Sequence, residues 1–89
     1  MNPACVDCQR EMFCAKTGRV IEVRVILDDG SERPHQLWRA DEFRCRACNS
    51  SVLVAAKEAW MDFGVNREEF IAQKARAEAD NNLRPVRVR

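Results

Sequence analysis

In the segment RVIEVRVILDDGSERPHQLW, residues 19–38, Val23, Val25 and Leu27 alternate with Glu22, Arg24 and Ile26. A two-residue period of this kind is typical of a β-strand whose two faces have different surroundings. The pair Asp29-Gly30 favours a tight turn, so we predict a β-hairpin whose returning arm covers residues 32–38. Pro34 has no N–H to donate, which favours a bulge or a sheet edge at that position.

Two shorter segments on either side of this hairpin are also predicted to be strands. Residues 12–16 fit a short strand that a turn at residues 16–18 would end. The segment SSVLVAAKEAWMDFG, residues 50–64, fits either a strand over residues 51–55 or a helix, because its apolar residues also recur at helical spacing. We predict the strand for residues 51–55.

The clearest helical pattern is NREEFIAQKARAEAD, residues 66–80. Asn66 is a favourable N-cap, and Glu69 three residues later resembles a capping box. The apolar face of this helix is thin and consists of Phe70, Ile71, Ala75 and Ala79. We therefore expect one domain over residues 1–80 and a flexible tail over residues 81–89. The alternation of Val and Arg in the tail leaves an edge strand as the alternative.

Composition and charge place limits on the function. The chain has 89 residues, and a domain of this size buries a modest core and benefits from an additional cross-link. Its 15 basic and 14 acidic residues give a net charge of +1, so the sequence as a whole has no excess of positive charge for nucleic acid. Positions 1–20 lack an apolar run and no segment is long enough to span a bilayer, so we expect no signal peptide, no membrane contact and a cytoplasmic location.

Four of the five cysteines form two Cys-x-x-Cys pairs, Cys5 with Cys8 and Cys45 with Cys48. This spacing lets each tight turn present two sulfurs to one ion, and four thiolates are a closed, structural zinc site. Iron takes the same ligands, and two disulfides or a redox pair remain alternatives. We predict one structural Zn²⁺ on these four residues.

Further residues near the cysteines carry weaker signals. The position after such a turn favours a residue that tolerates a positive φ, and Gln9 and Asn49 are found there. Cys14 is interpreted as a small buried strand residue. His35, next to Pro34, is expected to face solvent or to form a hydrogen bond rather than to bind the metal.

The two Cys-x-x-Cys turns around a hairpin resemble the zinc-ribbon superfamily, over about residues 5–55. The stretch HQLWRADEFRCRAC, residues 35–48, is also similar to small uncharacterised zinc-ribbon proteins of phages and prophages. This resemblance implies an α+β fold with a β-hairpin or three-stranded sheet followed by a C-terminal helix, and the four cysteines as metal ligands. A treble-clef finger is the alternative if the residues after Cys48 are helical.

A filled four-thiolate site and the lack of any catalytic motif predict a binding protein rather than an enzyme. We expect a protein partner, and the resemblance implies a phage-type accessory protein or an inhibitor of a host factor. The expected contact residues are arginines of the hairpin and second Cys-x-x-Cys turn, with one tryptophan: Arg24, Arg33, Trp38, Arg39, Arg44 and Arg46.

Nucleic-acid binding through the same arginines together with Arg19 is the alternative function. Acidic residues interleave with these arginines in the sequence, which favours a charge-mixed surface that binds no phosphate. A homodimer through the helix and residues 52–63 is a third possibility, and the choice between monomer and homodimer stays open.

Overall fold

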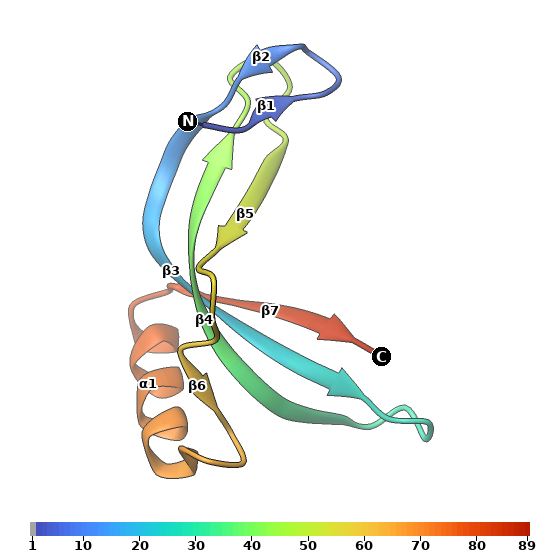
Figure 1. Ribbon diagram of the computed structural model, residues 1–89, viewed down its shortest axis with the longest axis vertical. Coiled ribbons are helices and arrows are strands. Elements are labelled where there is room, and N and C mark those ends of the chain that lie inside the picture. The colour runs from blue at the N-terminus through green and yellow to red at the C-terminus, as the bar shows by residue number, and fades with distance from the viewer. Residues whose placement is uncertain (1) are drawn as a thin grey trace.

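The computed structural model describes residues 2–89, which form an α+β fold with one helix and two sheets, a small antiparallel one and a larger mixed one (Figure 1). The smaller sheet pairs β1 (Ala4–Cys5) with β2 (Arg10–Glu11). The larger sheet has the strand order β5-β4-β3-β7, and β6 also pairs with β4. Its elements, with the helix, are β3 (Phe13–Ile26), β4 (Glu32–Arg44), β5 (Ser51–Ala55), β6 (Met61–Asp62), α1 (Arg67–Ala79) and β7 (Leu83–Val88).

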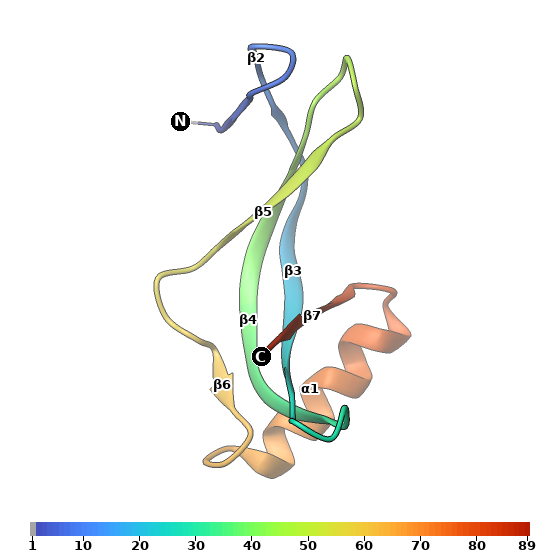
Figure 2. The same cartoon turned by 90° about the vertical axis from the view of Figure 1, so that its right-hand side faces the viewer.

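The predicted hairpin is the long, curved ribbon of β3 and β4 (Figure 2). Its turn has the expected place: Leu27 N–H donates to Ser31 O at 2.8 Å, and Asp29 Oδ1 accepts from the backbone N–H of Ser31 at 2.9 Å. The register shifts opposite Arg24, where β4 carries one extra residue next to Pro34. The predicted bulge at Pro34 is therefore confirmed, because a residue without an N–H fits an interrupted ladder.

The turn predicted at residues 16–18 is wrong. β3 continues through this segment, and its register against β4 shifts twice, between Cys14 and Lys16 and between Lys16 and Arg19. Gly18 has a φ of 67°, which a residue without Cβ adopts easily. Local turn residues here bend the strand instead of reversing it, because the partner strand β4 continues to pair on both sides of the bend.

The strand predicted for residues 51–55 is confirmed as β5, which pairs antiparallel with β4 from Ala40↔Ala55 to Arg44↔Ser51. The helical alternative is wrong, and so is the treble-clef fold, which needs a helix directly after Cys48. β-branched residues in this segment gain more from lying on the pleated surface beside β4 than from a solvent-exposed helix.

Helix α1 follows the prediction in its bounds but not in its details. Asn66 occupies the N-cap position, yet its side chain caps no helical N–H, and Glu69 instead accepts from Gln73 at 2.8 Å. The capping box is therefore wrong. The buried residues are Phe70 and Ala77, whereas Ile71 of the predicted apolar face is 53% exposed. No helix among residues 2–89 is long and apolar enough to cross a bilayer.

The flexible tail predicted for residues 81–89 is wrong, and the edge-strand alternative is correct. β7 pairs in parallel with β3 from Val20↔Leu83 to Val25↔Val88. Val20 N–H donates to Asn82 O at 3.2 Å, so in a parallel ladder the nitrogen of Pro85 points away from β3. A proline on this outer edge removes no ladder hydrogen bond and discourages further strands from adding there.

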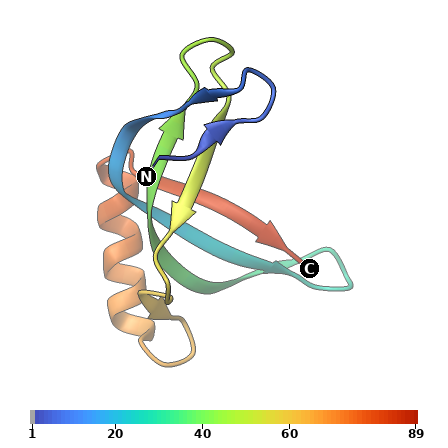
Figure 3. The ribbon, with the colours of Figure 1, turned by 45° about the horizontal axis from the view of Figure 1, so that its top comes forward.

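The core has two separate clusters. One, near the cysteines, contains Cys5, Met12, Phe43 and Cys45. The other, under α1, contains Val20, Leu37, Phe70 and Ala77. Figure 3 shows the N-terminal turn at one end of the ribbon, the hairpin turn between β3 and β4 at the other, and α1 beside the ribbon between these ends.

Both clusters lie on the same face of the β3–β4 ribbon, which we call the covered face. Val20, Leu37 and Phe43 project from this face, since side chains alternate along each strand and cross-strand partners share a side. Neither cluster includes a residue of the other face, which carries Ile21 and Trp38. We call that second side the open face.

Candidate metal centre

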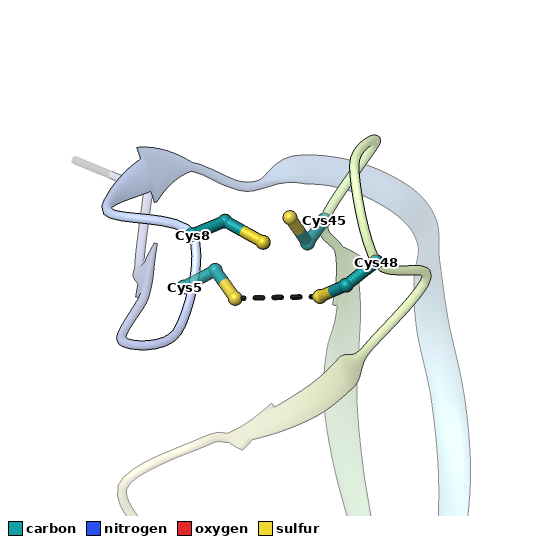
Figure 4. Close-up of side chains that lie close together, drawn as sticks. All are labelled: Cys5, Cys8, Cys45 and Cys48. Atoms are coloured by element: carbon teal, nitrogen blue, oxygen red, sulfur yellow. Dashed lines mark hydrogen bonds between the residues drawn. The ribbon is translucent and has the colours of Figure 1, made fainter.

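The four cysteines of the two Cys-x-x-Cys pairs converge at the end of the ribbon far from α1. Cys5 ends β1 and Cys8 lies on the turn between β1 and β2, while Cys45 and Cys48 lie on the turn between β4 and β5. Figure 4 shows the four side chains pointing toward one another from these two turns. Their Sγ atoms all lie within 4.8 Å of one another. The hairpin therefore returns the second pair to the first across 36 intervening residues.

The two turns have the same local structure. Gln9 N–H donates to Cys5 O at 2.7 Å, and Asn49 N–H donates to Cys45 O at 2.9 Å. Gln9 has a φ of 54° and Asn49 a φ of 61°. Both positions thus adopt the left-handed conformation that the sequence predicted for the residue after each pair.

Hydrogen bonds from the turns set the acidity of the thiols. Backbone N–H groups of Cys48 and Ala47 lower the pKa of Cys45. The hydroxyl of Ser50, whose oxygen lies 3.0 Å from the Cys48 sulfur, and the Ser50 N–H lower the pKa of Cys48 to about 6. These donors favour the thiolate, which is the form that binds a metal.

Protons shared between the sulfurs act in the other direction at Cys8. Its hydrogen bonds to the sulfurs of Cys48 and Cys45 raise its pKa to about 12. A cation at the centre of the four sulfurs would replace the shared protons, so binding would release protons to solvent.

The arrangement fits a tetrahedral metal ion. Four sulfurs at about 2.3 Å from a central ion lie about 3.8 Å from one another. The Sγ atoms of Cys5 and Cys48 are 3.6 Å apart, and all five cysteines are free thiols. A redox Cys-x-x-Cys usually begins a helix, but both pairs here lie on turns between strands. The geometry therefore supports a metal site over a redox pair.

Cys14 and His35 lie outside this centre. Cys14 is on β3 as expected, but it is exposed, so its predicted burial is wrong. The reason is the register: Cys14 pairs with Phe43 at a point where β3 then bulges away from β4. His35 is exposed beside the bulge at Pro34, as predicted, and its carbonyl accepts from Phe63 N–H at 2.9 Å.

The six residues predicted to bind a partner divide between the two faces. Arg24 and Arg39 lie on the covered face; Arg24 pairs with Glu22 at 2.8 Å, and the Arg39 guanidinium lies 4.1 Å from the ring centre of Trp60. These two arginines are thus engaged within the protein.

The other four predicted residues lie on or beside the open face. The cross-strand register places Arg33, Trp38 and Arg44 there. The guanidinium of Arg46 lies 4.3 Å from the ring centre of Phe13, which pairs with Arg44. The predicted set is therefore two groups on opposite sides of one sheet, not a single patch.

Sequence reasoning missed the role of Glu42 and Arg84. Glu42 is only 1% exposed, and its carboxylate contacts the guanidinium groups of Arg19, Arg44 and Arg84. For Arg84 the only available signal was indirect: the alternation of Val and Arg after Pro85 indicated that the C-terminal segment containing Arg84 could form a strand. No pattern in the sequence identified the strand that this segment would join.

Comparison of this chain with protein-family models, with curated proteins and with solved structures gives no match. The assignment of the centre therefore depends on its own geometry: four converging sulfurs on two equivalent turns, a site suited to one metal ion.

Proposed function

We propose that this protein is a non-enzymatic binding module whose Cys-x-x-Cys end is held together by one structural zinc ion. The observation that carries the proposal is the convergence of four sulfurs within 4.8 Å from two turns that are distant in sequence. Four thiolates complete the tetrahedral shell of zinc, so no position is left for a substrate or a reactive water. The ion is then part of the fold, and the function lies in the surface that the fold presents.

Zinc is favoured over iron because closed four-cysteine sites of structural type are characteristic of zinc. The N–H and O–H donors at Cys45 and Cys48 stabilise thiolates, which is what this ion requires. The expectation of a cytoplasmic protein agrees with this assignment, because thiols stay reduced there. A phage-type accessory protein acting on a host protein is the finer hypothesis, and it is supported by the sequence resemblance.

The test is to measure the metal on protein purified under reducing conditions. Elemental analysis should give one zinc per chain, and cobalt substitution should give the absorption of a tetrahedral thiolate site. Cys8→Ser should lose stoichiometric binding, whereas the matched control Cys14→Ser should retain it, since Cys14 lies outside the cluster. A folded protein without stoichiometric metal would refute the proposal, and stoichiometric iron would refute the choice of zinc.

A further inference from the structure

Basic residues are concentrated on the open face, although the chain as a whole is nearly neutral. Between the Cys-x-x-Cys end and the middle of the ribbon, the cross-strand register gives this face four basic side chains and one acidic one. The side chains of this region, which we call the basic patch, are Phe13, Lys16, Arg19, Trp38, Glu42, Arg44 and Arg84.

The acidic residues that interleave with the arginines in the sequence lie elsewhere. Glu22, Glu32 and Asp41 project from the covered face, and Asp28 and Asp29 lie in the hairpin turn. Glu22 is neutralised there by Arg24 and by Lys74 of α1, each at 2.8 Å. The charge-mixed surface expected from the sequence is therefore not what forms on the open face.

Glu42 organises the basic patch. Its carboxylate accepts from Arg19 Nε at 3.0 Å and from Arg44 Nη2 at 3.0 Å, and Arg84 Nη1 lies 3.6 Å away. One buried negative charge thus holds three positive ones, and Lys16 lies opposite Glu42 on β3. The local charge remains positive, which favours an anionic ligand.

The guanidinium groups keep free donors for such a ligand. Each guanidinium has five N–H donors. Glu42 accepts one hydrogen bond from Arg19 and two from Arg44, and Arg84 forms only an ion pair with it at 3.6 Å. The side chains of Arg44 and Arg84 are 43% and 45% exposed, so their remaining donors can reach an oxyanion from solvent. Because Glu42 already fixes these side chains, a ligand loses less binding energy in ordering them.

An aromatic ring lies at each end of the basic patch. Phe13 pairs with Arg44, and Trp38 is six residues from Arg44 along β4, a separation of about 20 Å. Both rings are half-buried, and the Trp38 indole N–H is occupied by Gln36 at 3.0 Å. Two rings with fixed cations between them match a chain of bases and phosphates, because bases stack on aromatic faces and phosphates accept from guanidinium groups. The Arg46 guanidinium already covers one face of the Phe13 ring, 4.3 Å from its centre, so Trp38 is the ring on which we expect a base to stack.

We propose that the basic patch binds single-stranded nucleic acid. Duplex nucleic acid would offer its phosphates but not its stacked base faces to a sheet surface, and an acidic peptide would not use the rings. The inference rests on the proposed function of a binding module, and it names nucleic acid instead of a host protein as the partner of that module. The zinc ion itself need not touch this partner.

The experiment is fluorescence anisotropy of a labelled oligothymidine of about ten nucleotides, titrated with zinc-loaded protein at several salt concentrations. The affinity should fall as salt rises, by about 0.7 in the log–log slope for each phosphate contact. Arg44→Gln with Arg84→Gln should weaken binding at least tenfold and reduce the slope by about 1.4. The control pair Arg67→Gln with Arg76→Gln makes the same charge change on α1 and should leave binding unchanged.

A second measurement tests base stacking. Trp60→Phe leaves Trp38 as the only tryptophan, and its fluorescence should be quenched by the oligonucleotide but not by polyglutamate. Zinc content and circular dichroism of each variant show that it is folded.

Four outcomes would overturn the inference: no binding at low salt, equal loss in the α1 control pair, equally tight binding of duplex, and equally tight binding of polyglutamate. If the protein nevertheless holds one zinc, the nucleic-acid proposal fails alone. Loss of the metal site would instead refute the proposed function.

Discussion

Removal of the zinc ion should unfold the Cys-x-x-Cys end and leave the α1 end folded. The reason is that the protein has two clusters with no residue in common, one around Met12 and Phe43 and one around Leu37 and Phe70. The curved ribbon of β3 and β4 is the main connection between them (Figure 1). A perturbation at one cluster can therefore remain local.

The magnitude follows from what each end buries. Apart from the ligands, the Cys-x-x-Cys end buries two large apolar side chains, Met12 and Phe43, at 5% and 9% exposure. Their burial contributes about 3–6 kcal/mol together. Zinc binding by small four-ligand peptides contributes roughly 10–16 kcal/mol. The ion thus stabilises this end more than its packing does, and the turns should not persist without it.

The assay is hydrogen–deuterium exchange with mass spectrometry on zinc-loaded and chelator-treated protein under reducing conditions. The amides of Gln9 and Asn49, which donate within the two turns, and of Met12, which donates to Pro3 O, should lose protection on chelation. The amides of α1 should keep theirs. Cys45→Ser should show the chelated pattern without chelator, and Cys14→Ser should behave like the unaltered protein.

Two results would refute this reasoning. Unchanged protection at the turns would mean that the ion is not structural. An equal loss of protection in α1 would mean that the ribbon couples the two clusters into one cooperative unit, contrary to the separation described above.

Two further predictions concern the sheet. Burial alone would raise the pKa of Glu42, but hydrogen bonds and charges of Arg44 and Arg19 outweigh it and hold the pKa below its ordinary value of 4.5. The ionised Glu42 therefore stabilises the folded protein at any pH above the pKa of this carboxyl in the unfolded chain. The stabilisation is lost as the pH falls through the lower pKa that the carboxyl has in the folded protein. Glu42→Gln should therefore lower the free energy of unfolding at pH 7 by about 1–3 kcal/mol. Urea titrations at decreasing pH should show that the difference in this free energy between the variant and the unaltered protein disappears below pH 4.5. A difference that stays constant with pH would contradict this role of Glu42. Deletion of residues 83–89 removes β7 from its place beside β3 and removes Leu83 from the cluster under α1. The Tm should therefore fall by roughly 5–15 °C. An unchanged melting curve would show that this segment has no structural role.

Local patterns in the sequence were enough for features whose partners are close along the chain. The hairpin turn at Asp29 and Gly30 depends on residues within the turn itself, and it forms where predicted. The positive φ values of Gln9 and Asn49 follow in the same way from the geometry of a Cys-x-x-Cys turn. The spacing of the cysteines also identified the residues of the metal centre, because two sulfurs on one tight turn need no distant information to face the same ion.

Features that depend on long-range pairing were decided by the tertiary structure. Residues 83–88 carry only a weak strand signal, and they become ordered because the edge of β3 is free to accept them in parallel. The turn signal at Gly18 was overridden by continued pairing with β4 on both sides.

The distribution of charged side chains between the two faces of the sheet also depended on the tertiary structure. Glu22 and Glu42 are alike in sequence, each followed by an apolar residue and then an arginine, yet they project from opposite faces of the ribbon. A shift of one residue in register moves a side chain to the other face of a sheet, and β3 and β4 have three such irregularities. The sequence therefore determined which charges the chain carries, while the register of the folded sheet determined which of them share a surface.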